Sequence, residues 1–443
     1  MNLHYVSSIK MTSLLRALAA PAMAMHFEMN GQLRVRAWYL DNYWPNERAG
    51  AQVGDFEFID QRFRTTLTWG LTESVFLRAR ADINEGFWGS NVGQVTEVAT
   101  IDPVTGISAQ GLEFENIQAK DQIAFDQMYG QVAFPGMPLT MTIGRQPANW
   151  GTKAFVGSDN RDRLKLIYKV GDWSLGLVYD KFIESFEQEL IGAASDSRGY
   201  GALIAGSAGG WKMGFIYYLS RNEAASDAFL PAGADPSPFD NTTHGFTPYI
   251  IGQAGPVAIK AELSYATGEA GLKGGPSTDV EGLGAYLGGF YQAGMANLGL
   301  EFGYSQGNDP NTADGEGAVR HDYHTPFNSI ILFNGMDYQG YDNLANGVGG
   351  DIGLANALAV KGTVTATPSE KLSLTGAVVW AQRDEVQVPG QSDELGFEAD
   401  VIATYNLYDN VAFTAGFGYL WAGDYYETDD DPMGLMVGTE MKF

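Results

Sequence analysis

Cysteine is absent from this chain of 443 residues. Its absence excludes disulfide frameworks, zinc sites with cysteine ligands and thiol chemistry. It also agrees with a route through the periplasm, where stray thiols are oxidised. Histidine is scarce, at five residues, and His321 and His324 form an H-x-x-H pair without the helical H-E-x-x-H context of a zinc protease. Periodicity brings no Ser-His-acid arrangement together, so the sequence predicts neither an enzyme nor a cofactor.

Charged residues are few, at 18% of the chain, whereas soluble domains carry about 25%. Long apolar runs are also missing. Apolar residues form 45% of the chain, yet no stretch approaches the about 20 continuous apolar residues that a membrane helix needs. They come instead as short alternating runs, which are typical of strands.

Basic residues are outnumbered, and the net charge is −26. This charge repels phosphate backbones, so we expect no binding of nucleic acid. The acidic residues are concentrated in the long segments between the predicted strands, and we therefore expect most of the acid to lie outside a membrane.

The N-terminus is typical of a leader. Lys10 gives a short basic start, and the stretch after it is mostly small and apolar and ends with the A-x-A pattern Ala22-Met23-Ala24. We predict a signal peptide over residues 1–24 and the mature protein over 25–443. Arg16 interrupts the apolar stretch, so an N-terminal helix in the periplasm stays the alternative.

Alternation begins at His26. Apolar residues such as Phe27 and Met29 share one parity, and polar residues such as Glu28 and Arg34 share the other. Because side chains alternate across a strand, one face is apolar and one polar. A soluble sandwich would alternate in the same way, with its apolar face inward, so the connections must separate the two folds.

The connections are alternately short and long. Short turns are expected near residues 70–73, 135–138, 171–172, 206–210, 254–256, 293–297, 368–371 and 408–410. Long connections are expected near residues 84–121, 147–161, 184–196, 221–242, 268–279, 307–352, 383–391 and 423–431. This pattern predicts an all-β fold, a transmembrane antiparallel β-barrel of about eighteen strands with short periplasmic turns and long extracellular loops.

The end of the chain is the most specific local feature. Met433, Leu435 and Val437 alternate with small or polar residues, and the chain stops on Phe443. A last strand with a terminal aromatic resembles the signal that barrels present to their insertion machinery. We therefore expect that machinery as a partner, and the outer membrane of a Gram-negative bacterium, with its lipid and lipopolysaccharide, as the location.

Two segments resemble a known family. The first contains Ile143-Gly144-Arg145-Gln146, Trp150-Gly151 and the run from Asn160 to Leu166; the second extends from Ala403 to Asp424. Both are similar to outer-membrane porins of the alginate-export type. The resemblance implies an eighteen-stranded barrel with loops folded over or into the lumen. The lumen of those exporters is strongly basic, whereas the inward parity here carries both signs.

The polar parity supplies the residues that we expect to line a pore. They are Arg34, Arg36, Arg62, Arg64, Arg78, Arg80, Arg163, Lys165 and Lys169. Facing lipid, each arginine would cost about 2–4 kcal/mol at the membrane midplane. They form either a net basic strip or a wall neutralised by Glu28, Asp60, Asp82 and Asp126. Arg145 continues the outward parity, so either a bulge at Gly144 reverses the register or Arg145 lies above the membrane.

Two loops carry further hypotheses. Glu113, Glu115 and Asp121 of the 84–121 connection are expected to fold inward as a constriction opposite the arginines, with an outward loop as the alternative. Asp309, Asn311 and Asp314 approximate a calcium loop with one residue too many. Solvated loop acids are the simpler explanation of this second pattern.

Together these features favour an outer-membrane porin that lets small polar or charged solutes diffuse passively. One alternative is an alginate-type exporter of polysaccharides or sugar acids. Another is a structural or adhesin barrel whose lumen is filled by residues 307–352 and 84–121. A homotrimer is compatible with the apolar outer face, and the sequence does not choose between monomer and trimer.

Overall fold

The barrel closes on itself. In the computed structural model, eighteen antiparallel strands form one sheet, and β1 pairs with both β2 and β20. The structure describes residues 26–42, 55–88, 95–101, 108–114, 123–156, 160–183, 197–223, 240–272, 274–316, 319, 327–333, 354–386, 388–426 and 430–443. The predicted leader, residues 1–24, lies outside these ranges.

Each strand of the barrel is followed by its neighbour in the chain, with one interruption after β3. The strands are β1 (His26–Asp41), β2 (Phe56–Thr72), β3 (Val75–Phe87), β6 (Ile123–Ala133), β7 (Leu139–Pro147), β8 (Asn160–Val170), β9 (Trp173–Ile183), β10 (Ser197–Ala208), β11 (Trp211–Asn222), β12 (Asn241–Ala254), β13 (Val257–Gly271), β14 (Ser277–Ala293), β15 (Ala296–Ser305), β16 (Ala357–Ser369), β17 (Leu372–Arg383), β18 (Glu394–Tyr408), β19 (Val411–Ala422) and β20 (Met433–Lys442). The predicted fold class is confirmed.

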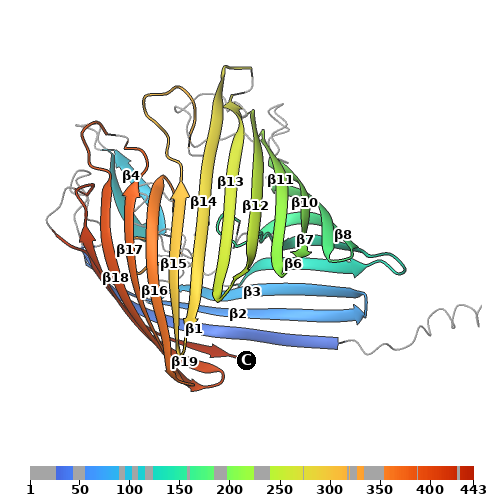
Figure 1. Ribbon diagram of the computed structural model, residues 1–443, viewed down its shortest axis with the longest axis horizontal. Helices are drawn as coiled ribbons and strands as arrows, with labels where there is room; N and C mark the ends of the chain where they lie inside the picture. Colours follow the sequence, from blue (N-terminus) through green and yellow to red (C-terminus); the bar gives the residue numbers. More distant parts are fainter. Residues whose placement is uncertain are drawn as a thin grey trace, which may run out of the picture.

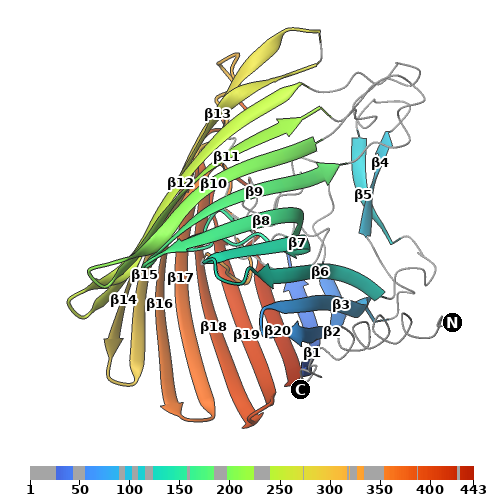
Figure 2. The ribbon, with the colours of Figure 1, turned by 90° about the vertical axis from the view of Figure 1, so that its right-hand side faces the viewer.

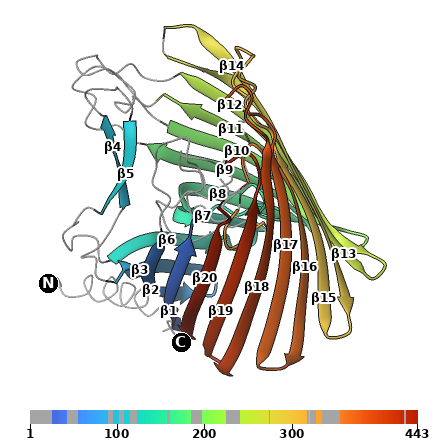
Figure 3. The ribbon, with the colours of Figure 1, turned by 90° about the vertical axis from the view of Figure 1, so that its left-hand side faces the viewer.

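The interruption after β3 is a separate hairpin. β4 (Val95–Ile101) and β5 (Ser108–Phe114) pair with each other and form their own two-stranded sheet. Figures 2 and 3 show this hairpin apart from the barrel strands. Among the described residues, none lies in a helix long and apolar enough to cross a membrane.

The strands are strongly tilted. In Figure 1, β1, β2 and β3 run across the view, whereas β14 and β16 run steeply down it. Opposite walls of a barrel cross in this way when each wall is inclined by about 35–45° to the axis. The tilt lets strands of ten to seventeen residues cross a membrane, as β15 and β14 illustrate.

The two faces of the sheet differ as the alternation predicts. On the outer face, Leu177, Leu300 and Val401 are each at least 60% exposed. On the inner face, Asp60, Asp180 and Glu398 are completely buried. A soluble sandwich would bury the first set and expose the second, so this arrangement fits a surrounding of lipid and an interior of polar groups.

The short turns are confirmed, and one long connection is not. Only residues 272–276 separate β13 from β14, because both strands continue past the point where their alternation weakens. Figure 2 shows this hairpin extending beyond its neighbours. Trp38 lies near the end of β1 and is buried inside the barrel, where its indole donates to Asp60. Its even parity, shared with Arg34 and Arg36, already placed it on the inner face.

The seam of the barrel depends on a glycine. The Gly31 N–H donates to the carbonyl of Phe443 at 2.9 Å, and the Phe443 N–H donates back at 3.0 Å. The Phe443 ring stacks on Phe63 with centroids 5.7 Å apart. A Cβ atom on Gly31 would lie 2.6 Å from this ring, so only glycine lets the terminal aromatic lie flat across the seam.

Replacing this glycine should weaken closure of the barrel. We expect Gly31→Val to lower the thermal unfolding midpoint and the yield of heat-modifiable, folded protein on gels, with an overpacking cost of about 1–3 kcal/mol. Gly376→Val is the matched control, since a Cβ there meets nothing within 4 Å. Equal unfolding midpoints for the two variants would contradict this role of Gly31.

Candidate functional site

Arginines of the inner face begin at β1. The Arg36 Nε donates to both carboxylate oxygens of Asp60, at 3.0 and 3.1 Å, and Arg34 Nη2 lies 3.7 Å from Asp60 Oδ1. The Trp38 indole N–H donates to the same carboxylate at 2.9 Å. Asp60 is reached by all three because β1 and β2 pair in register, with Arg36 directly opposite Asp60.

The pairing continues across β2, β3 and β6. Arg64 donates to Asp82 at 2.5 and 2.6 Å and lies 3.6 Å from Asp126. Arg80 donates to Asp126 through Nε at 2.8 Å. A register shift between Arg80 and Ala81 accompanies this contact, and such bulges re-aim side chains. Arg62 lies 3.6 Å from Glu85.

A second group lies on β8 and β9. Arg163 donates to Asp180 at 2.6 and 2.7 Å, and Arg161 donates to it at 3.4 Å. The Tyr218 hydroxyl donates to Asp180 from β11 at 2.5 Å. Asp180 therefore has donors on two sides, which is the condition for burying a carboxylate completely.

We call these ion pairs the arginine belt. Its seven arginines are Arg34, Arg36, Arg62, Arg64, Arg80, Arg161 and Arg163, and they share the five acids Asp60, Asp82, Glu85, Asp126 and Asp180. Arg78 and Lys165 face the same interior. Arg78 donates hydrogen bonds to the hydroxyls of Thr68 and Tyr129. Lys165 follows Arg163 by two residues on β8 and therefore shares its face of the strand.

The belt presents its two signs unequally. The Asp82 side chain is 7% exposed and that of its partner Arg64 is 23%; Asp180 is fully buried while Arg161 is 20% exposed. Asp60 is buried in the same way beneath Arg36, at 1% against 15%. The Arg62–Glu85 pair is the reverse, with Arg62 at 7% and Glu85 at 32%. Around Asp60, Asp82 and Asp180, the positive groups are therefore more accessible from the interior than the acids they pair with.

The sequence left open whether the arginines form a net basic strip or a wall neutralised by acids, and the observed ion pairs bear on this choice. Asp60, Asp82 and Asp126 pair with arginines as the neutralised wall requires, whereas Glu28 lies 4.0 Å from His26 instead. The roles of Glu85, Arg161 and Asp180 were not foreseen. Arg161 shares the parity of Arg163, so the alternation alone could have placed it on the inner face.

Two other basic residues differ from the belt. Arg145 faces outward and lies 3.3 Å from Asp162, and the pairing of β7 with its neighbours continues through Gly144 without a register shift. The bulge alternative is therefore wrong. Lys169 is exposed near the end of β8, beside the short connection to β9.

Connections between strands also enter the interior of the barrel. Residues 148–156, between β7 and β8, reach the opposite wall: the Thr152 N–H and hydroxyl donate to Glu262 at 2.5 and 2.8 Å. The Trp150 indole donates to the Thr247 carbonyl at 2.9 Å. The apolar side chains of residues 327–333, between β15 and β16, are buried against the inner face of the barrel wall. These two segments narrow the interior from the side opposite the belt.

The predicted constriction involves a different loop. Glu113 belongs to β5, but its side chain lies outside the described part of the structure, as do Glu115 and Asp121. Their inward folding stays a prediction.

The calcium hypothesis also stays a prediction. The Asp309 carboxylate accepts hydrogen bonds from the N–H and the side-chain amide of Asn311, both at 2.8 Å, so the loop is bonded within itself. Asp314 is in the same described segment. Within the described ranges, no three His, Asp or Glu side chains are grouped so as to hold a metal ion. His321 and His324 lie outside those ranges.

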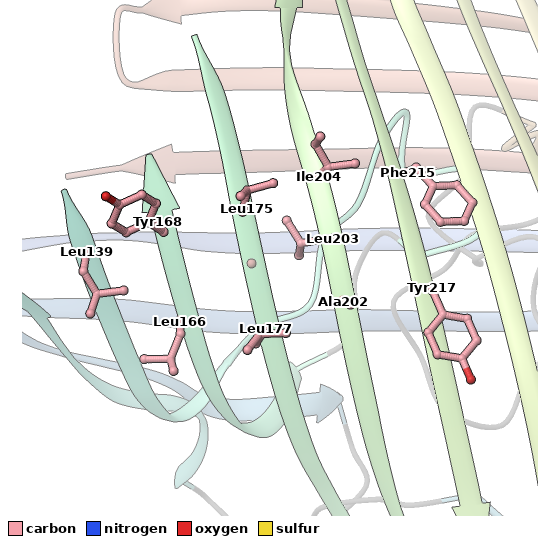
Figure 4. A pocket seen from close by; sticks show the side chains of 11 residues that line it. Leu139, Leu166, Tyr168, Leu175, Leu177, Ala202, Leu203, Ile204, Phe215 and Tyr217 are labelled. Atoms are coloured by element: carbon pink, nitrogen blue, oxygen red, sulfur yellow. The ribbon is translucent and has the colours of Figure 1, made fainter. Parts of the chain in front are cut away.

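An apolar groove of about 530 Å³ lies on the outer face of β7 to β11. Figure 4 shows Leu166, Leu177 and Phe215 among its lining side chains. They have the outward parity, and Leu177 is among the most exposed apolar residues. This groove faces lipid, so the polar interior, not the groove, is the candidate site for solutes.

Solved structures with the same fold are outer-membrane proteins of Pseudomonas aeruginosa. OccK5 (OpdH) is 11% identical, with 94% of this chain and 98% of that chain covered and a TM-score of 0.52. OccK8 (OprE) is 10% identical with the same coverage and TM-score. OpdL is 12% identical, with 94% and 99% covered and a TM-score of 0.50. No protein-family model and no curated protein sequence matches the chain.

These likenesses show the fold, and the exposed apolar outer face supplies the physical reason for its surroundings. The chain is a transmembrane barrel of the bacterial outer membrane. The more specific resemblance to porins of the alginate-export type stays a prediction, because no family model supports it.

Buried and exposed acids of the same region should differ in what they contribute. We expect Asp180→Asn to destabilise the barrel by about 3–5 kcal/mol, because two arginines lose a buried partner. Asp162→Asn removes an exposed partner of Arg145 and should cost about 0–1 kcal/mol. Denaturant unfolding followed by tryptophan fluorescence measures the free energy of unfolding of each variant. An Asp180→Asn barrel as stable as the Asp162→Asn barrel would refute the buried pairing.

Proposed function

We propose that the barrel is a porin, through which small polar or charged solutes diffuse passively, with a preference for anions. One observation carries this proposal: Asp60, Asp82 and Asp180, which hold most of the arginines of the belt, are more buried than the guanidinium groups bonded to them. A solute on the axis is nearer to the positive charges, and the low-dielectric wall strengthens their field in the interior.

The size of the barrel supports a pore. Eighteen strands enclose more space than the side chains of the wall fill, whereas eight strands are packed solid. Arginine also keeps its charge at every physiological pH. A belt built from arginine therefore gives a selectivity that does not depend on the pH outside the cell.

The exporter alternative receives less support. A polyuronate needs a wide and continuously basic lumen. Here five acids pair with the arginines of the belt, and the segments 148–156 and 327–333 narrow the interior from the other side. These features favour small solutes over a polymer.

A structural barrel with a closed lumen is the second candidate, and the buried apolar side chains of residues 327–333 favour it. The two candidates differ in conductance. A porin gives discrete open steps in a planar bilayer, and its reversal potential across a KCl gradient has the sign of anion selectivity. Folded protein without steps would reject the porin and support the closed barrel.

The basic residues without an acid partner in the belt allow a finer test. We expect the double variant Arg78→Gln, Lys165→Gln to lower the chloride-to-potassium permeability ratio by up to about fivefold per charge, since a charge about 4 Å away in water is worth about 1 kcal/mol. Arg145→Gln is the matched control, because Arg145 faces outward. Equal ratios in the double variant and the control would show that Arg78 and Lys165 do not contribute to the selectivity.

A further inference from the structure

The segment Phe327–Phe333 is docked on a surface made for it. The inner face beneath it carries four glycines, Gly303, Gly416, Gly418 and Gly434, which we call the glycine platform. A Cβ atom on Gly418 would lie 2.7 Å from Ile330 Cβ, and one on Gly434 would lie 2.7 Å from Ile330 Cγ2. A Cβ on Gly303 would overlap the Phe327 ring. Larger residues at these positions would lift the segment from the wall.

A single carboxylate holds the segment from below. Glu398 of β18 accepts hydrogen bonds from the N–H groups of Ile331 and Leu332 and from the Ser329 hydroxyl, each at 2.7 Å. The Ser329 hydroxyl also accepts the Phe333 N–H at 2.9 Å, which closes the turn. Successive N–H groups that converge in this way form an anion-binding nest, and Glu398 occupies it from the wall.

Neighbouring charges complete the dock. Lys361 of β16 donates to the Asn328 carbonyl at 2.7 Å, and the Ile330 N–H lies 3.4 Å from Asp400 Oδ2. Glu398 is completely buried, and Asp400 is 3% exposed. Two buried carboxylates side by side, with one lysine, need these backbone donors, so the wall depends on the segment as much as the segment depends on the wall.

Apolar contacts cover the rest of the segment. Ile331 and Leu332 are completely buried in a cluster that includes Leu40 of β1 and Leu395 and Leu420 from the wall. The segment therefore fills the side of the barrel next to β16 to β20, and the space that remains is bounded by the arginine belt.

We propose that Glu398 is the positioning residue of the pore: it holds Phe327–Phe333 on the glycine platform, and the docked segment confines solutes to a narrow path along the arginine belt. This inference rests on the proposed porin function. It assigns the width of the path to one buried carboxylate that is not itself in contact with the solute.

The first test is the single-channel conductance of Glu398→Ala. Without the carboxylate, the N–H groups of Ile331 and Leu332 lose their acceptor, and we expect the segment to leave the wall and the conductance to at least double. Glu301→Ala is the matched control: Glu301 is a buried interior carboxylate that accepts from the Tyr286 hydroxyl at 2.7 Å, and within the described residues it makes no hydrogen bond to Phe327–Phe333. Its conductance should stay at the wild-type value.

A disulfide can distinguish two causes of a higher conductance in Glu398→Ala, namely displacement of the segment and loss of the negative charge of Glu398. The chain has no cysteine, so Ile330→Cys with Gly434→Cys supplies the only pair. In the Glu398→Ala background, oxidation should pin the segment and restore the wild-type conductance, and a reductant should raise it again. A change caused by the lost charge alone would not respond to oxidation.

Each failure has its own meaning. A wild-type barrel without conductance contradicts the proposed function, whereas a conducting wild type that Glu398→Ala leaves unchanged contradicts only this inference. If Glu398→Ala does not fold, Ile330→Asp places a charge on the glycine platform and should open the pore instead. In the otherwise wild-type chain the disulfide should form readily, and a pair that stays reduced would show that the segment is not docked.

Discussion

A carboxylate on the inner wall of a barrel must find donors, because a buried charge without partners costs several kcal/mol. This protein places Asp60, Asp180, Glu262 and Glu398 there with almost no exposure to solvent. On one side the donors are arginines of neighbouring strands. On the other side they are backbone N–H groups of connections that fold inward. The division of the interior into a basic wall and a wall covered by loops follows from these two ways of satisfying the same need.

The alternation of the sequence determines most of the fold. Because the side-chain period of a strand is two, the parity of a residue assigns it to lipid or to the interior. This reasoning placed Arg34, Arg64 and Arg163 on the inner face, and tight turns such as Pro135-Gly136-Met137-Pro138 marked where the strands reverse. The same parity accounts for Trp38, whose side chain is buried inside the barrel.

The partners of each side chain could not be predicted in the same way. Which carboxylate an arginine reaches depends on register, and a one-residue shift such as that between Arg80 and Ala81 changes the neighbours. The positions of the segments that fold into the barrel could not be predicted for another reason. Ser329 to Leu332 contact Glu398 across 66 to 69 positions of the chain, and nothing local to a loop indicates the wall on which it lies. In the sequence, the glycines of the platform are only residues with a low preference for strands, and nothing indicates that a segment packs on them.

The central claim is that the inner face lines a water-filled path. Single cysteines along β8 test it directly, because the chain has none of its own. In lipid vesicles, a membrane-impermeant charged thiol reagent should label cysteines that replace Arg163, Lys165 and Ile167, and should leave those that replace Leu164 and Leu166 unlabelled. Alternating labelling of this kind would support the account. No labelling at the inward positions of a folded barrel would mean that the interior is closed to water, and would contradict it.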